Sequence, residues 1–133
     1  MPFSLDNKYI IETEKELGVV FPDNFKSKMT QENGGELETE NDNWQLFPFF
    51  DKSDKKRIRR TCNHIGLETK QAKEWGNFPT SGIAIASNGS GDILILLPKT
   101  ENENELSNEI FIWYHETGQI KKVADNIDEL NDN

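Results

Sequence analysis

The sequence predicts an α+β fold: a mostly antiparallel sheet flanked by N-terminal helices and a short C-terminal helix. Helical periodicity dominates the first part of the chain, while the second part consists of short β-rich runs separated by turn residues. This order places helices first and a meandering sheet later. The 133 residues are the usual size of one compact domain, so we expect residues 1–133 to form a single domain.

Two helices are expected at the N-terminus. Between residues 4 and 17 apolar side chains recur at helical spacing, and Gly18 then supplies the left-handed stop that ends many helices. Pro22 suits the first turn of a second helix, in which apolar side chains are spaced i, i+4. This second helix is expected to end near "NGG" at residues 33–35.

The middle of the chain predicts less regular structure. The polar, acidic residues 35–43 are expected to form a loop or a frayed hairpin. "WQLFPFF" at residues 44–50 alternates well enough for a strand, in which Pro48 indicates an edge or a bulge. An exposed charged segment follows at residues 51–60, and a third helix is expected over residues 62–75.

The remaining strands are expected in the second half. The runs at residues 82–87 and 92–98 are separated by four turn-type residues, which predicts a hairpin. "EIFIWYHE" at residues 109–116 alternates like a strand, and residues 119–124 form the last one. Asn126 has the capping-box spacing that begins a short closing helix.

The glycines of "SNGSGDILILL", residues 87–97, raise the question of a phosphate-binding loop. Phosphate loops of the common kind precede a helix, whose N-terminal amides hold the anion. Here a strand follows, no Lys-Ser or Lys-Thr pair is present, and Asp92 would repel a phosphate. Turn residues at positive φ explain Asn88 and both glycines without a ligand, so the stretch predicts a hairpin turn.

Charge and composition restrict the class of partner. The chain has 15 Lys and Arg against 24 Asp and Glu, a net charge of -9, which argues against unaided binding to nucleic acid or an anionic membrane. This charge suits a basic partner, and it also suits solubility alone. The single cysteine, Cys62, excludes an internal disulfide and indicates a cytoplasmic location. We find no secretory signal pattern and no apolar run of membrane-spanning length.

Five of the six residues in "KKRIRR", Lys55–Arg60, are basic. They could form a nucleic-acid patch, a solvated loop balanced by nearby acids such as Asp51 and Asp54, or an internal counter-charge for the acidic loops. Because the whole chain carries a charge of -9, the solvated loop is the favoured interpretation.

The sequence holds no recognisable catalytic or metal-binding motif, so we expect no enzymatic activity, no cofactor and no metal. His64 and His115 are the only histidines, and neither belongs to a zinc-binding pair. Cys62 and His64 lack an orienting third group, and no nucleophile elbow is present. The residues that could converge across the sheet are of common types: Ser87, Ser90, Asp92 and His115.

Carboxylates are concentrated in two polar runs that should project as loops and steer a basic protein partner. The strand at residues 109–116 is apolar on both faces, and an uncovered aromatic face would be an interface. No direct contact with nucleic acid or membrane is expected. The candidate partner-binding residues are Glu36, Glu38, Glu40, Asp42, Asp92, Glu101, Glu103, Glu105, Trp113 and His115.

Three stretches, in this order, resemble the SUKH superfamily, which includes the fungal cell-wall-synthesis regulators of Smi/Knr type. "IIETEKELGVVFPDNFKSKMTQENGG" resembles its N-terminal signature of two helices separated by a Leu-Gly stop and an apolar-Pro step. "GIAIASNGSGDILILL" resembles the central hairpin. "IFIWYHETGQIKKVADNIDEL" resembles the last strands and closing helix, with Trp113, His115 and Glu116 before the turn. Residues 36–76 match only loosely.

The resemblance implies an α+β fold without enzymatic activity. It implies that bacterial members are immunity proteins, which bind and neutralise polymorphic or contact-dependent toxins, often nucleases. A nuclease toxin is basic because it must hold a polyanion. Two other classes stay open: an intracellular regulatory or scaffold protein of Smi/Knr type, and a small hydrolase or ligand-binding protein that uses residues 88–92 with His115. The family's partner contacts vary, and we expect a monomer or a weak dimer.

Overall fold

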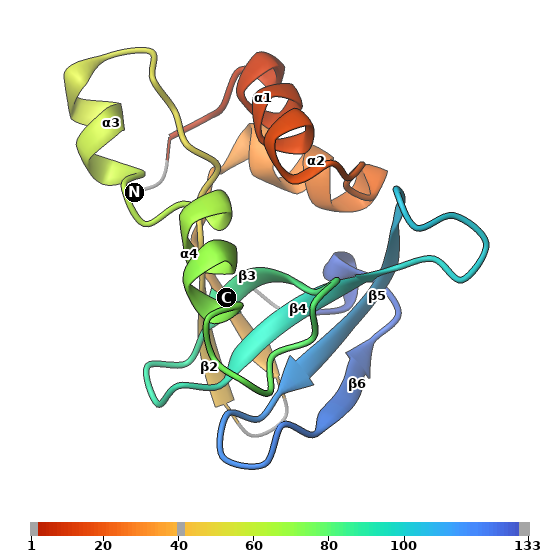
Figure 1. Cartoon of the computed structure of the whole chain (residues 1–133). Coiled ribbons are helices and arrows are strands. Elements are labelled where there is room, and N and C mark those ends of the chain that lie inside the picture. The colour runs from red at the N-terminus through yellow and green to blue at the C-terminus, as the bar shows by residue number, and fades with distance from the viewer. Residues whose placement is uncertain (1–2, 40–41, 131–133) are drawn as a thin grey trace.

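The computed structural model describes residues 3–39 and 42–130 and has the predicted α+β architecture (Figure 1). Six strands form one antiparallel sheet in the order β1-β2-β3-β4-β5-β6. The strands are β1 (Glu36–Thr39), β2 (Asp42–Leu46), β3 (Ile83–Ser87), β4 (Ile93–Pro98), β5 (Leu106–Trp113) and β6 (Ile120–Ala124). The helices are α1 (Asn7–Leu17), α2 (Asp23–Gln31), α3 (Lys55–Arg60) and α4 (Ile65–Ala72), followed by the 3-10 turn η1 (Ile127–Glu129).

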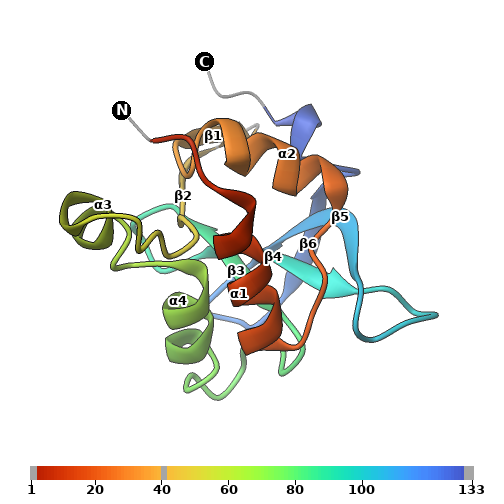
Figure 2. The ribbon, with the colours of Figure 1, turned by 90° about the horizontal axis from the view of Figure 1, so that it is seen from above.

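The sheet is a meander, because each strand pairs with its neighbours along the chain. Register shifts in the β3–β4, β4–β5 and β5–β6 pairs mark bulges, which bend the strands and increase the twist. Helices α1 and α2 lie together over one end of the sheet, and α4 packs on β3 (Figures 1 and 2). Helix α3 lies at the periphery, outside the other helices (Figure 2).

The two predicted N-terminal helices are confirmed. Asp6 caps α1, because its carboxylate accepts a hydrogen bond from the Lys8 amide at 3.0 Å. Gly18 ends α1 in the left-handed region, with a φ of 72°. Helix α2 buries Phe25 and Met29, which is the face that their spacing predicts.

The region around β2 is more regular than a loop. Residues 36–39 and 42–46 pair as the β1–β2 hairpin, so the hairpin alternative is the correct one. The strand expected over residues 44–50 is too long, because β2 ends at Leu46, before Pro48. Strand β2 pairs with β1 on one side and β3 on the other, so a proline inside it would leave a ladder acceptor without its donor.

The basic run Lys55–Arg60 is helix α3, so the prediction of an exposed loop is wrong. Asp54 caps this helix by accepting a hydrogen bond from the Arg57 amide at 2.8 Å. Lysine and arginine are also good helix formers, so the same residues that make this segment basic favour a helix. The segment is nevertheless at the surface, because α3 contains no buried residue.

The helix expected over residues 62–75 is confirmed only in its central part, as α4 (Ile65–Ala72). It begins late because His64 adopts an extended backbone and caps it, with Nδ1 accepting a hydrogen bond from the Leu67 amide at 3.2 Å. Gly66 is tolerated inside α4 and is buried.

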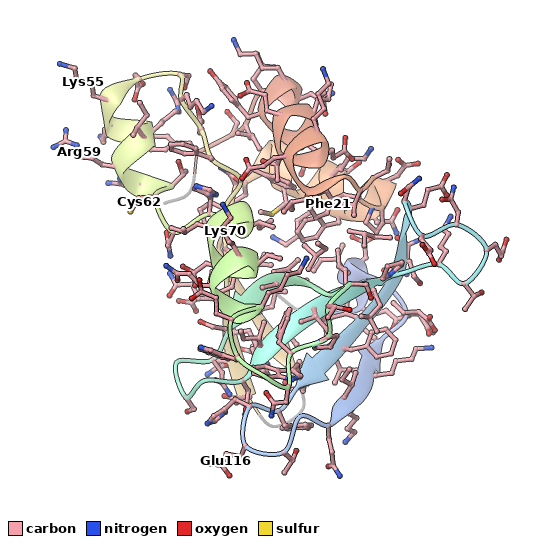
Figure 3. The ribbon with its side chains drawn as sticks, in the orientation of Figure 1. Phe21, Lys55, Arg59, Cys62, Lys70 and Glu116 are labelled. Atoms are coloured by element: carbon pink, nitrogen blue, oxygen red, sulfur yellow. The ribbon has the colours of Figure 1, made fainter. Side chains whose placement is uncertain are left out.

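The core occupies both faces of the central strands, since residues 83–86 of β3 and 93–96 of β4 are all buried. An aromatic cluster of Phe21, Phe25 and Phe49, with ring centroids 5.1 to 5.9 Å apart, packs beneath the helices. Figure 3 shows Phe21 between the α1–α2 pair and the sheet. The helices are therefore fixed to the sheet by large apolar side chains.

Candidate functional site

Part of the predicted partner-binding set gathers at one hollow of about 520 Å³ on the sheet, which we call the acidic hollow. Glu38 and Asp42 reach it from the β1–β2 hairpin, and Asp92 reaches it from the residue before β4. Trp44 and Tyr114 add aromatic surface to the same hollow. Strands from the two ends of the sheet therefore contribute to one concave surface.

The electrostatic balance of the acidic hollow is negative. Glu129 adds a fourth carboxylate, and Lys121 and Lys122 are the basic residues that line it. Lys122 is engaged elsewhere, because its ammonium lies 2.9 Å from a carboxylate oxygen of Glu109 and also pairs with Asp125. Hydrogen bonds with Asp125 and Glu109 raise the pKa of Lys122 above its usual range. Among the described residues, Glu38, Asp42 and Glu129 therefore have no ion-pair partner, whereas Asp92 pairs with His115.

Among the carboxylates that line the acidic hollow, Asp92 makes the most hydrogen bonds within the described residues. Its Oδ1 accepts a hydrogen bond from the His115 amide at 3.1 Å and lies 2.7 Å from the ring Nδ1 of His115. Asn88 Nδ2 donates to Asp42 Oδ2 at 2.7 Å and to Asp92 Oδ2 at 3.4 Å. Partial burial raises the pKa of Asp92, but the hydrogen bonds from His115 and Asn88 lower it by more, so the carboxylate stays charged.

The glycines of the β3–β4 turn have a conformational role, which supports the turn interpretation of "SNGSG". The positive φ expected at Asn88 is wrong, because among the described residues only glycines have a positive φ. Asn88 contributes to the turn through its side chain, which accepts a hydrogen bond from the Ser90 amide at 2.9 Å. Gly91 has a φ of 107° and lies against the imidazole of His115, so an added Cβ would be 2.9 Å from Nδ1. Gly89 also has a positive φ, of 83°, but faces open space. The chain needs these glycines to turn and to let His115 approach the backbone.

Among the described residues, no hydroxyl or thiol is hydrogen-bonded to the imidazole of the Asp92–His115 pair, as nucleophilic catalysis needs. Within residues 3–39 and 42–130, the ring of His115 has polar contacts with Asp92 and, at 4.0 Å, with the carboxylate of Glu116. In the same part of the chain, neither Ser87 nor Ser90 donates a hydroxyl hydrogen bond to that ring. The contacts of Asp92 and His115 therefore hold two turns of the sheet together.

The described residues include neither a metal-ligand cluster nor a helix that could span a membrane. Among them no group of three or more His, Cys, Asp and Glu is placed to hold a metal ion. Of the helices in this part of the chain, none has the length and apolar character needed to cross a bilayer. Cys62 is exposed and unpaired with any thiol, while the neighbouring His64 caps α4 and stacks on Phe50.

The second acidic group lies on the β4–β5 loop, residues 99–105, which projects from the molecule (Figure 2). Glu101 and Glu103 are exposed, while Glu105 is partly covered and pairs with Lys99 at 3.1 Å. The base of the loop is fixed, because the Val20 amide donates to the Asn104 carbonyl at 2.7 Å. The exposed carboxylates are thus presented on an anchored loop.

A shallow apolar hollow of about 260 Å³ lies beside this loop, and sequence reasoning missed it. Ile11 on α1 and Val20 after α1 line it with exposed fractions of 42% and 45%. Asn104 of the acidic loop borders it directly. The sequence indicates this hollow only through Ile11, an apolar residue that does not lie on the buried face of α1. We call this surface, defined by Ile11, Val19, Val20 and Asn104, the apolar hollow.

The other predicted residues lie outside the acidic hollow and the β4–β5 loop, and one of them is in the core. Glu36 lines a different hollow together with Phe3 and Arg60. Trp113 is 0% exposed, and its indole N–H donates to the Asn77 carbonyl at 3.0 Å, so this side chain belongs to the core. Glu40 lies outside the described residues.

The expectation of an uncovered aromatic face on β5 is corrected at Trp113. Trp75 stacks on its ring at a centroid distance of 5.4 Å, and Phe78 packs edge-on at 5.1 Å. These residues follow α4, so the segment after that helix covers this face of the sheet. Trp75 itself is 45% exposed.

A scan against protein families matches the SMI1/KNR4 family (SUKH-1) over residues 4–133. The comparison with curated proteins and the comparison with solved structures gave no match. The matched region includes the N-terminal helices, the β3–β4 hairpin and the closing strands on which the resemblance rests. The chain belongs to the SMI1/KNR4 family (SUKH-1).

Proposed function

We propose that this chain is a non-catalytic immunity protein that binds and neutralises a basic toxin, of which a nuclease fits the charge best. Family membership supports the proposal, because SUKH proteins are often immunity proteins. The observation that carries it is the position of the acidic β4–β5 loop beside the apolar hollow. Protein interfaces combine an apolar centre with a polar or charged rim, and this surface has both parts.

The proposed encounter begins with electrostatic steering. Glu101 and Glu103 stand exposed on an anchored loop, and the whole chain carries a charge of -9. A nuclease must present cations to hold its polyanionic substrate, so its active surface is attracted to this field. Such steering raises the association rate and weakens as salt screens the charges.

Docking then requires desolvated contacts. Ile11 and Val20 would cover an apolar side chain of the toxin, while Glu38 and Asp92 of the acidic hollow would receive lysine or arginine side chains. The toxin is inhibited by occlusion, because its own substrate cannot reach a surface that this chain covers. No bond is made or broken in this scheme, and the protein acts in the cytoplasm.

Growth rescue tests the proposal. The toxin encoded beside this chain is expressed in a bacterium with and without the chain, and the two proteins are then purified together. We expect growth to be restored and a complex of equal amounts to be recovered. Continued growth arrest, with no complex at low salt, would contradict the proposal.

The same family match also accommodates an intracellular regulatory or scaffold protein of Smi/Knr type. That alternative predicts a stable complex with one of the cell's own signalling proteins and no protection against a toxin. The two classes therefore separate in the growth experiment, in which a scaffold protein leaves the arrest unchanged.

A further inference from the structure

Helix α3 is the one feature of the sequence that the proposed function leaves unused. Its six residues include five cations, and the helix buries no side chain. Arg57 has a structural role, since its Nε lies 3.5 Å from Asp51 Oδ2 and its guanidinium pairs with Asp54 at 3.1 Å. Asp51 itself is buried, so this contact fixes α3 to the body of the protein.

The other four cations of α3 have no carboxylate partner within ion-pair distance among residues 3–39 and 42–130. They are Lys55, Lys56, Arg59 and Arg60, and all four are exposed. In a chain with a net charge of -9 and 24 acidic residues, four unneutralised cations on one short helix are unexpected.

These four cations share one side of α3. They occupy positions i, i+1, i+4 and i+5, which at about 100° per residue fall within a sector of about 140°. Arg57 and Ile58 occupy the opposite side, where Arg57 meets Asp51. Figure 3 shows Lys55 and Arg59 directed away from the molecule. We call the surface formed by Lys55, Lys56, Arg59 and Arg60 the basic face.

The basic face is held in place by an aromatic ring. The cationic groups of Lys56, Arg57 and Arg60 lie 5.7, 4.5 and 5.4 Å from the ring centroid of Phe3. Cation–π contacts of this kind restrict long side chains that would otherwise move freely. These side chains therefore lose less conformational entropy when a ligand binds.

We propose that the basic face binds a short acidic segment of another protein. This goes beyond the proposed function, because a basic toxin surface would be repelled here. The residues of α3 contribute +5, so the rest of the chain carries -9 - 5 = -14. Five of the fifteen basic residues thus lie in one short helix, which is at the periphery of the fold (Figure 1).

A nucleic acid fits this distribution less well. Helix α3 is about 9 Å long at 1.5 Å per residue, whereas a DNA duplex carries a charge every ~1.7 Å along its whole length. A duplex would continue past the basic face along a protein whose other residues carry a net charge of -14. A few carboxylates in a peptide stay within about one Debye length, ~8 Å at physiological salt, of the four cations.

Fluorescence anisotropy with a labelled oligo-aspartate peptide tests the proposal, with a labelled DNA duplex as a second probe. The test variant carries Lys55→Gln, Lys56→Gln, Arg59→Gln and Arg60→Gln. The control variant carries Lys8→Gln, Lys28→Gln, Lys70→Gln and Lys73→Gln, which change the net charge equally and lie outside α3. A smaller variant, Lys55→Gln with Arg59→Gln, keeps the contacts to Phe3 and covers the case in which the quadruple variant unfolds.

We expect the peptide to bind the unmodified chain at physiological ionic strength, where charges beyond about one Debye length are screened, and more weakly as salt rises further. Affinity should fall about tenfold in the test variant, severalfold in the double variant and little in the control. The proposal is overturned if the peptide does not bind, if the control loses as much affinity as the test variant, or if the duplex binds α3 more tightly than the peptide.

Discussion

The carboxylate of Asp92 lies 2.7 Å from the imidazole Nδ1 of His115 and also accepts a hydrogen bond from the backbone amide of the same residue. The two residues come from different turns, Asp92 from the β3–β4 turn and His115 from the segment after β5. Asn88 extends the connection to Asp42 at the start of β2. Three connections of the meander are thus held together beside the acidic hollow.

Replacing Asp92 by Asn should destabilise the fold by about 1 kcal/mol near neutral pH, less than a fully buried charged hydrogen bond because Asp92 is partly exposed. Partial burial raises the Asp92 pKa, but the hydrogen bonds from His115 and Asn88 leave it below 3.8. Its contribution is therefore present above that pH and is lost as the pH falls through the folded-state pKa. Urea unfolding at several pH values measures the difference.

Glu116→Gln is the matched control for this variant. Glu116 is exposed and its carboxylate is 4.0 Å from Nε2 of His115, so its removal should leave stability unchanged. If both variants lose the same stability, or if the effect of Asp92→Asn persists undiminished in acid, the role given to the Asp92 charge is wrong.

Gly91→Ala should cost more stability than Gly89→Ala. Both positions have positive φ, so each alanine carries a backbone penalty of about 1 kcal/mol. At Gly91 the new Cβ would also meet the His115 ring at 2.9 Å, which we expect to add ~1 kcal/mol or more, since the ring is held by Asp92. Thermal unfolding of the two variants compares them, and equal losses would contradict the close approach of His115.

Stability should decrease as the pH falls below neutrality because of His64. Burial lowers the pKa of His64 from 6.5, an effect that the charge of Glu16 opposes and that of Lys52 reinforces. The unfolded chain therefore binds the proton first. The stabilisation from neutral His64 is present above pH 6.5 and is lost as the pH falls from there through the lower folded-state pKa. Neutral Nδ1 is also the acceptor that caps α4.

His64→Asn tests whether His64 causes this pH dependence. Asparagine is a good N-cap and does not titrate, so α4 should remain capped while the pH dependence becomes smaller. Urea midpoints between about pH 7 and pH 5 give the comparison. An unchanged slope in the variant would show that His64 is not responsible.

Val20→Ser should weaken toxin binding without unfolding the chain, because the Val20 side chain is 45% exposed while its backbone pairs with the β4–β5 loop. We expect an affinity loss of about tenfold for a contact at the centre of an interface. Ile120→Ser is the control, since Ile120 is similarly exposed, at 41%, but lies on β6, and it should change little. Equal effects of the two variants would remove the apolar hollow from the interface.

Local features of the chain were predicted well because their causes are local. Gly18 ends α1, and the glycines of the β3–β4 turn allow a hairpin. Both effects depend on the local backbone and not on the position of distant residues. The error at α3 was also local, since Asp54 has an N-cap position before a run of good helix formers. The sequence therefore contains the N-cap residue of α3, although the charge pattern alone does not indicate a helix.

The candidate surfaces depend on contacts between distant residues and could not be predicted from spacing. Trp113 is buried because Trp75 and Phe78, more than thirty residues earlier, cover it. The apolar hollow forms because Val20 pairs with the loop that contains Asn104. The alternation of apolar residues states which face of a strand they share, but not what covers that face.

A titration of the purified toxin with the purified chain tests the central claim most directly. A protein that acts by covering its target is consumed in the complex, so toxin activity should fall linearly and end at one equivalent of the chain. The same endpoint should be reached however long the mixture is incubated. Complete inactivation by a small fraction of an equivalent, progressing with time, would show turnover and contradict the claim that no bond is made or broken.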